Sequence, residues 1–130
     1  MNVEPDSLEH LYLNMGGGDW LSIRAVNYEA KAFEPDEVKR KALVLSTMRS
    51  LAEAGYFRIG QVRGIDPEEP AIAFFEWPGT LDEQIERLNG VYMPEGRDDT
   101  DWAWLCMFDL TEEGERLEES LPPLDERFFD

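Results

Sequence analysis

The amino-acid sequence predicts a single α+β domain, with three N-terminal helices, a small three-stranded antiparallel sheet and an extra helix before the last strand. A length of 130 residues suits one hydrophobic core. Up to residue 55, apolar residues recur mainly at helical spacing, whereas later apolar runs are short and separated by turn residues. With 42% hydrophobic and 12% aromatic residues, the chain has enough apolar material to fold.

The first two helices are predicted from their N-terminal caps. Asp6 is expected to cap the first helix, with Glu9 reaching back toward the cap, and the glycines at 16–18 end the helix. Asp19 is expected to cap the second helix. Its apolar positions are Trp20, Leu21, Ile23 and Val26.

The third helix is the longest and has the best-defined end. Pro35 suits its first turn, and Gly55 is expected to end it in a left-handed conformation. The apolar face is predicted to comprise Val38, Ala42, Leu45, Met48 and Ala52, widened by Val44 and Leu51.

Two strands are predicted next, at residues 56–62 and 71–77. Their connection at 66–70 is acidic and contains two prolines, so the strands are expected to form a hairpin with a long tip. Thr80 and Glu83 have the spacing of a capping box, which opens another helix.

The remaining elements follow a polar loop at 94–101. Asn89-Gly90 is expected to end the preceding helix. Residues 102–110 are apolar at nearly every position, which predicts a central third strand with Trp102 and Trp104 on one sheet face. Thr111 is expected to cap the last helix.

Two segments carry a resemblance to winged-helix regulators. The run LSTMRSLAEAGYFRIGQV at 45–62 resembles the end of a recognition helix passing into a wing. The run FDLTEEG at 108–114 is similar to the strand-to-helix exit of that family. The resemblance covers about residues 6–63 and 102–119, implies DNA binding, and makes the helix at 80–89 an insertion within the wing.

The chain also resembles small actinobacterial proteins of unassigned function. The shared motifs are a helix end at 51–55, F-x-x-W at 74–77, W-x-W-L at 102–105 and T-x-x-G at 111–114. This resemblance implies no activity.

No residue pattern for catalysis or cofactor binding is present. The single histidine, His10, is expected on a solvated helix surface, and no G-x-S-x-G motif accompanies it. The three glycines at 16–18 lack the Lys-Ser/Thr pair of a phosphate-binding loop, because Asp19 and Trp20 follow them. We therefore expect neither an enzyme nor a cofactor, although an enzyme that uses Asp or Glu alone stays open as a distant third alternative.

Metal and disulfide chemistry are also not expected. Cys106, the only cysteine, lies in an apolar run and is expected to be a buried, inert thiol. Asp98, Asp99 and Asp101 offer oxygen ligands, but the glycine and glutamate of an EF-hand are missing. The N-terminal residues lack the pattern of a signal peptide, and no apolar stretch has transmembrane length, so a cytoplasmic location is expected.

Charge is the most informative feature of the sequence. The net charge of −17 disfavours nucleic acid and anionic membranes as partners. Residues 64–130 carry 20 acids and four bases, whereas residues 24–63 carry eight bases and five acids. Our first hypothesis is a non-catalytic protein that binds a basic protein partner, as an inhibitor, an immunity protein or a nucleic-acid mimic. The expected contact residues are Asp66, Glu68, Glu69, Asp98, Asp99 and Asp101.

The alternative hypothesis is a winged-helix DNA-binding regulator. Basic residues follow one another along the third helix and the hairpin. The DNA-contacting residues would be Lys39, Arg40, Lys41, Arg49, Arg58 and Arg63. The acidic hairpin tip opposes this hypothesis, since a wing tip that contacts phosphate should be basic.

Overall fold

The computed structural model describes residues 1–94 and 100–129, with the backbone alone for Thr100 and Asp101. The elements are α1 (Leu8–Gly16), β1 (Leu21–Ser22), α2 (Ile23–Ala30), α3 (Glu37–Glu53), β2 (Phe57–Gly64), β3 (Ile72–Glu76), α4 (Leu81–Val91), α5 (Thr100–Ala103), β4 (Met107–Leu110), α6 (Glu112–Ser120) and a 3₁₀ turn, η1 (Glu126–Phe129). The predicted α+β class is confirmed. None of the helices in this described part is long and apolar enough to cross a membrane.

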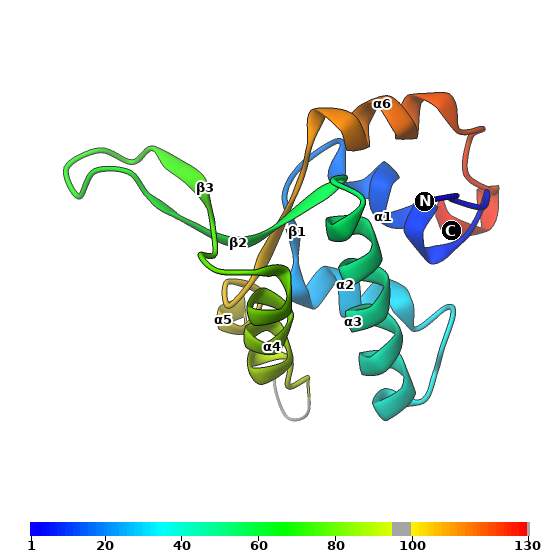
Figure 1. Cartoon of the computed structure of the whole chain (residues 1–130), viewed down its shortest axis with the longest axis horizontal. Coiled ribbons are helices and arrows are strands. Elements are labelled where there is room, and N and C mark those ends of the chain that lie inside the picture. The colour runs from blue at the N-terminus through cyan, green and yellow to red at the C-terminus, as the bar shows by residue number, and fades with distance from the viewer. Residues whose placement is uncertain (95–99, 130) are drawn as a thin grey trace.

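The sheet is antiparallel and has the strand order β1-β4-β2-β3. In β4, Phe108 pairs with Leu21 of β1 on one side and with Ile59 of β2 on the other. The predicted hairpin of β2 and β3 is confirmed, and it extends away from the helices (Figure 1). The prediction of three strands is wrong, because β1 has only two residues and is too short to show strand periodicity.

The core lies between one face of this sheet and helices α1, α2 and α3. Phe57 and Ile59 of β2 alternate with outward residues, and both are buried together with Phe108 of β4. Tyr12 of α1 is also fully buried, and its hydroxyl donates to the Val26 carbonyl at 2.5 Å. Each such side chain contributes roughly 1.5–3 kcal/mol through burial.

Helix α3 turns inward a face that overlaps only in part with the one predicted. Val38, expected in the core, is 79% exposed, and Ala42 is also exposed. The prediction is confirmed for Val44, Met48 and Leu51 and wrong for Val38 and Ala42, because two of the residues that point inward are polar and conceal the apolar periodicity. The buried residues of α3 are Arg40, Val44, Thr47, Met48 and Leu51.

Several predicted helix ends are confirmed. Gly55 has a φ of 85°, and the N–H of Tyr56 donates to the Leu51 carbonyl at 2.9 Å, as in a Schellman motif. Thr80 and Glu83 form the reciprocal bonds of a capping box. Thr111 caps α6 through a bond from the Gly114 N–H at 3.1 Å.

Three other predicted helix boundaries are wrong. Ser7, not Asp6, caps α1, and Asp6 instead has a φ of 64°. Ser22, not Asp19, caps α2, because the residues between Asp19 and the helix include β1, which pairs with β4. Helix α4 continues through Gly90 to Val91, since a glycine within an exposed helix lowers its stability without ending it.

The predicted third strand at 102–110 is wrong in its first half. Trp102 belongs to the short helix α5, and only residues 107–110 are extended. A continuous apolar run does not distinguish a buried strand from a buried helical turn. Trp102 is buried and its indole N–H donates to the Val91 carbonyl at 3.4 Å, whereas Trp104 is 52% exposed, so the two do not share a sheet face.

Candidate functional site

The acidic residues predicted to bind a partner do not form one described surface. Asp66, Glu68 and Glu69 are exposed at the hairpin tip, which stands apart from α5 in Figure 1. Asp98 and Asp99 lie outside the described residues, as does the side chain of Asp101. The hairpin tip is therefore a separate group of carboxylates at one extremity of the molecule.

A larger group of carboxylates lies at the opposite end, where α6, α1 and both termini meet (Figure 1). We call this group the acidic end. Its exposed members on α6 and the C-terminal segment are Glu112, Glu113, Glu115, Glu119, Asp125 and Glu126. No ion pair of these six carboxylates occurs within the part of the chain that the structure describes. The acidic end therefore presents unneutralised negative charge to solvent.

The start of α6 is fixed against the end of α3. The Thr111 hydroxyl donates to the Gly55 carbonyl at 2.6 Å, and the Thr111 N–H donates to the Tyr56 carbonyl at 3.0 Å. Gly114 is buried there, and a Cβ at this position would lie 2.5 Å from the Tyr56 carbonyl oxygen. Residues 110–114 therefore pack closely against the end of α3, and this contact orients α6.

The rest of the acidic end is held on α1. The Asn14 amide donates to Glu118 at 3.1 Å, and the Asp125 N–H donates to the Asp6 carboxylate at 2.8 Å. Phe128 stacks on Phe33, with ring centroids 5.9 Å apart. The C-terminal segment is therefore docked on the helices, which fixes the backbone that carries these carboxylates.

The three basic residues at the start of α3 differ in accessibility. Lys39 is exposed, whereas Arg40 is only 6% exposed. Lys41 is half-buried, donates to the Asn89 carbonyl at 3.1 Å, and lies over the Tyr92 ring. Of this group, only Lys39 extends freely into solvent.

The other three predicted DNA-contacting residues also interact within the molecule. Arg49 pairs with Asp82 of α4. Arg58 donates through Nε to Asp109 of β4 at 3.0 Å. The Arg63 guanidinium lies 4.1 Å from the centroid of the Phe75 ring, where it remains exposed. These contacts reduce the positive charge that α3 and the hairpin offer to a nucleic acid.

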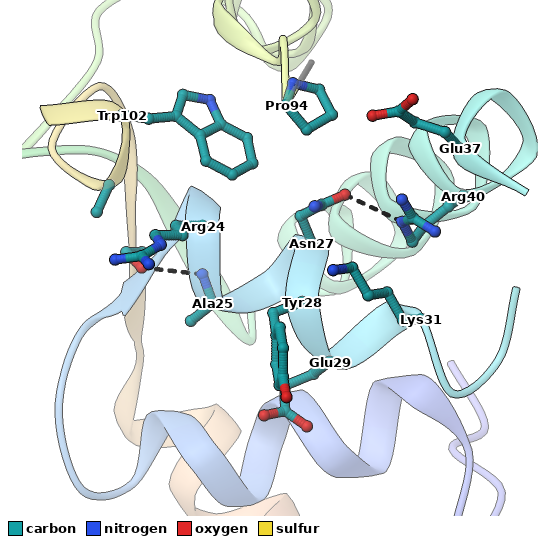
Figure 2. Close-up of a pocket in the computed structure, with 12 residues that line it drawn as sticks. Arg24, Ala25, Asn27, Tyr28, Glu29, Lys31, Glu37, Arg40, Pro94 and Trp102 are labelled. Atoms are coloured by element: carbon teal, nitrogen blue, oxygen red, sulfur yellow. Dashed lines mark hydrogen bonds between the residues drawn. The ribbon is translucent and has the colours of Figure 1, made fainter. Parts of the chain in front are cut away.

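A cavity of about 550 Å³ opens between α2, the first turn of α3, and α5 (Figure 2). We call it the Arg40 pocket. Arg24 and Asn27 of α2 and its C-cap residue Lys31 line this cavity, because residues at i, i+3 and i+7 share one helix face. Tyr28 and Glu29 of α2, Glu37 and Arg40 of α3, Pro94, and Trp102 of α5 complete most of the lining.

The floor of the Arg40 pocket is a buried polar network. Arg40 Nε donates to Asn27 Oδ1 at 3.2 Å, and the Tyr92 hydroxyl donates to the same oxygen at 2.5 Å. Arg40 Nη1 donates to the carbonyls of Glu34 and Pro35 at 3.3 and 2.9 Å. Burial raises the pKa of the Tyr92 phenol, and nearby Arg40 opposes that shift in part. The phenol therefore stays protonated and donates at neutral pH.

The residues considered for catalysis are buried structural groups. His10, expected to be solvated, is 1% exposed, and its Nδ1 accepts from the Asp6 backbone N–H at 2.9 Å. That prediction is wrong, because the N-terminal segment folds back over the start of α1. Cys106 is buried as predicted, and burial raises the pKa of its thiol, which makes it a poor nucleophile. Among the described residues, no three potential ligands are grouped so that they could hold a metal ion.

Sequence reasoning missed the Arg40 pocket for a physical reason. The intervals of three and four residues between Arg24, Asn27 and Lys31 would have shown their common face if the start of α2 had been placed correctly. The contact between Arg40 and Asn27 has no local signal in the sequence, because it depends on how α2 crosses α3.

Comparison of the chain with family models, with curated proteins and with solved structures finds no match.

Proposed function

We propose that this protein acts without catalysis, by binding a basic protein surface through its acidic end. One observation supports the proposal most strongly. The carboxylates of the acidic end are exposed and unpaired among the described residues, whereas five of the six basic residues predicted to contact DNA interact within the molecule. The acidic end therefore offers unpaired carboxylates for recognition, although Arg116 and Arg127 are exposed in the same segment.

The geometry of α6 suits such recognition. Glu112, Glu115 and Glu119 are spaced so that they line one face of a helix whose other side packs on α1. A row of fixed carboxylates accelerates association with a basic surface and disfavours acidic partners. An inhibitor, an immunity protein or a nucleic-acid mimic would work in this way.

The test is capture of a partner from native lysate, followed by purification of that partner and measurement of its affinity by calorimetry at two salt concentrations. We expect a basic protein whose affinity falls at least tenfold between about 50 and 500 mM salt, since screening shortens the range of charge attraction. A partner whose affinity ignores salt would contradict the proposal, as would the absence of any basic partner.

Matched charge reversals distinguish the two acidic surfaces. The triple variant Glu112→Lys, Glu115→Lys and Glu119→Lys should weaken binding at least a hundredfold. The control, Asp66→Lys, Glu68→Lys and Glu69→Lys, makes the same change in net charge at the hairpin tip and should weaken it far less. If the tip variant has the larger effect, the hairpin is the contact surface and the acidic end is not.

A second candidate function is DNA binding by a winged-helix regulator. The order of elements favours it: β1 lies between α1 and α2, and β4 returns between β1 and β2 as a wing strand would. Helix α3 would then be the recognition helix. Its contact with α4 weighs against this function, because Asp82 neutralises Arg49 there.

A mobility-shift assay with duplex DNA at about 50 mM salt tests this second candidate under favourable conditions, because phosphate binding weakens steeply with salt. We expect no shift. A shift that Lys39→Glu abolishes, and that the hairpin-tip control leaves intact, would instead support binding through α3.

A further inference from the structure

Arg40 is a buried cation that has no anionic partner among the residues that the structure describes. It is 6% exposed, and its hydrogen bonds go to the neutral oxygens of Asn27, Glu34 and Pro35. Among the described residues, no carboxylate lies within ion-pair distance of it. Buried arginines are normally paired, because removing a full charge from water is costly. The guanidinium therefore leaves strong positive potential at the floor of the pocket.

Two hydrogen-bond donors of this network have no acceptor among the described residues. Asn27 is 6% exposed, and its Oδ1 must be the atom that faces Arg40, because Arg40 Nε can only donate. Asn27 Nδ2 and Arg40 Nη2 make no hydrogen bond within that part of the chain, and neither atom is sealed from the pocket. Neighbouring N–H groups of this kind match the oxygens of an anion.

The walls of the pocket limit the size and charge of that anion. Arg24 and Lys31 are exposed cations at the rim, and Glu29 and Glu37 are half-buried carboxylates in the lining. Together with Arg40, three positive and two negative side chains give the lining one net positive charge. This charge suits a monoanion better than a polyphosphate. Trp102 and Pro94 form a flat apolar wall opposite α2 (Figure 2). A volume of about 550 Å³ lies within the usual range for small-molecule sites.

We propose that the Arg40 pocket binds a small organic carboxylate with a planar apolar body. The carboxylate accepts from Arg40 Nη2 and Asn27 Nδ2, and Arg24 and Lys31 attract it from the rim. The planar body lies against Trp102 and Pro94. This site is on α2, α3 and α5, away from the acidic end, so it neither requires nor excludes a protein partner there.

The test is an NMR titration with benzoate and indole-3-acetate to about 20 mM at constant ionic strength. We expect saturable shifts of the Asn27 side-chain amide, the Arg40 Nε–H and the Trp102 indole N–H. Benzamide, the neutral analogue of benzoate, should produce none. The proposal is wrong if neither acid gives a saturable shift, or if inorganic phosphate alone does.

The most informative variant is Asn27→Asp. It keeps the shape of the side chain and supplies Arg40 with the missing negative charge, so the protein should remain folded, with a melting temperature no lower than the wild type. Binding of the carboxylate should weaken at least tenfold. Asn89→Asp, the same chemical change on the exposed surface of α4, should leave affinity unchanged. Wild-type affinity in Asn27→Asp would overturn the proposal.

Rim variants give an independent check that does not disturb the buried network. Lys31→Glu should weaken binding about fivefold, because it reverses an exposed charge at the pocket mouth. Lys39→Glu makes the same reversal on an exposed residue of α3 that does not line the pocket, and it should have at most a small effect. Equal effects of the two variants would show a general response to net charge and would contradict a defined site.

Discussion

At the acidic end, carboxylates on α6 and the C-terminal segment are exposed and unpaired within the described residues. In the Arg40 pocket, by contrast, a single guanidinium is buried in a network of neutral acceptors. The first arrangement places many charges in water, where each contributes little to stability. The second places one charge in the interior, where each hydrogen bond has a large effect.

The number of charges in a segment therefore does not measure how much they contribute to stability. The acidic end accounts for much of the negative surplus, yet its carboxylates can change at small cost to folding. Arg40 contributes one charge and holds α2, α3 and the preceding loop together. We therefore expect the two regions to respond very differently to substitution.

The largest effect should come from Arg40→Met. The variant leaves the carbonyls of Glu34 and Pro35 without their donor and removes one of the two bonds to Asn27. We expect the free energy of unfolding to fall by about 1–3 kcal/mol, because buried carbonyl oxygens lose their hydrogen-bond donor. Urea denaturation at pH 7 measures it.

Lys39→Met is the matched control for this change. Lys39 is the adjacent exposed base on the same helix, so its loss should alter the free energy of unfolding by less than about 0.5 kcal/mol. A similar stability for the two variants would show that the buried network carries no special weight.

Tyr92→Phe should have an intermediate effect. It removes one hydrogen bond to Asn27, which keeps its bond to Arg40, so the free energy of unfolding should fall by about 1 kcal/mol at pH 7.

Burial raises the pKa of the Tyr92 and Tyr12 phenols and of the Cys106 thiol in the folded protein. The unfolded chain therefore releases these protons at lower pH, and stability is lost as pH rises beyond the ordinary thiol and phenol values.

Urea denaturation between about pH 7 and 10.5 checks the alkaline part of this prediction. The free energy of unfolding should decline above about pH 8.5 in the wild type, and the decline should be shallower in Tyr92→Phe, because one fewer proton distinguishes the two states. Identical slopes would mean that the phenol titrates normally in the folded protein.

The smallest effects should come from single charge reversals on α6. Glu119 lies in the last turn, where a cation interacts favourably with the helix dipole, so Glu119→Lys should stabilise by about 0.3–0.5 kcal/mol. Glu112 lies in the first turn, and Glu112→Lys should destabilise by a similar amount. Thermal melts at about 20 mM and 500 mM salt should show opposite signs at low salt and convergence at high salt. Effects above about 1 kcal/mol would mean that these carboxylates have structural partners.

The local signals in the sequence predicted the elements whose ends are set by neighbouring residues. Three helix ends depend on hydrogen bonds within one helical turn, so they can be predicted without knowledge of the fold. They are set by Gly55, by the Thr80–Glu83 capping box and by Thr111. The hairpin was predicted for the same reason. The strand β1 and the helical conformation at Trp102 were not predicted, because each depends on residues elsewhere in the chain. Strand β1 forms by pairing with β4, and Trp102 packs against Val91 and Tyr92.

Composition and short-range hydrogen bonding were enough to predict the α+β class, the helix ends at Gly55, Thr80 and Thr111, and the surplus of negative charge. Which charges become buried depends instead on the tertiary structure. The crossing of α2 and α3 buried Arg40 against Asn27, and the docking of α6 on α1 fixed where the acids of the C-terminal segment lie in the molecule. Both outcomes depend on contacts between residues far apart in the chain, and the desolvation of a charge is set by those contacts and not by its sequence neighbours.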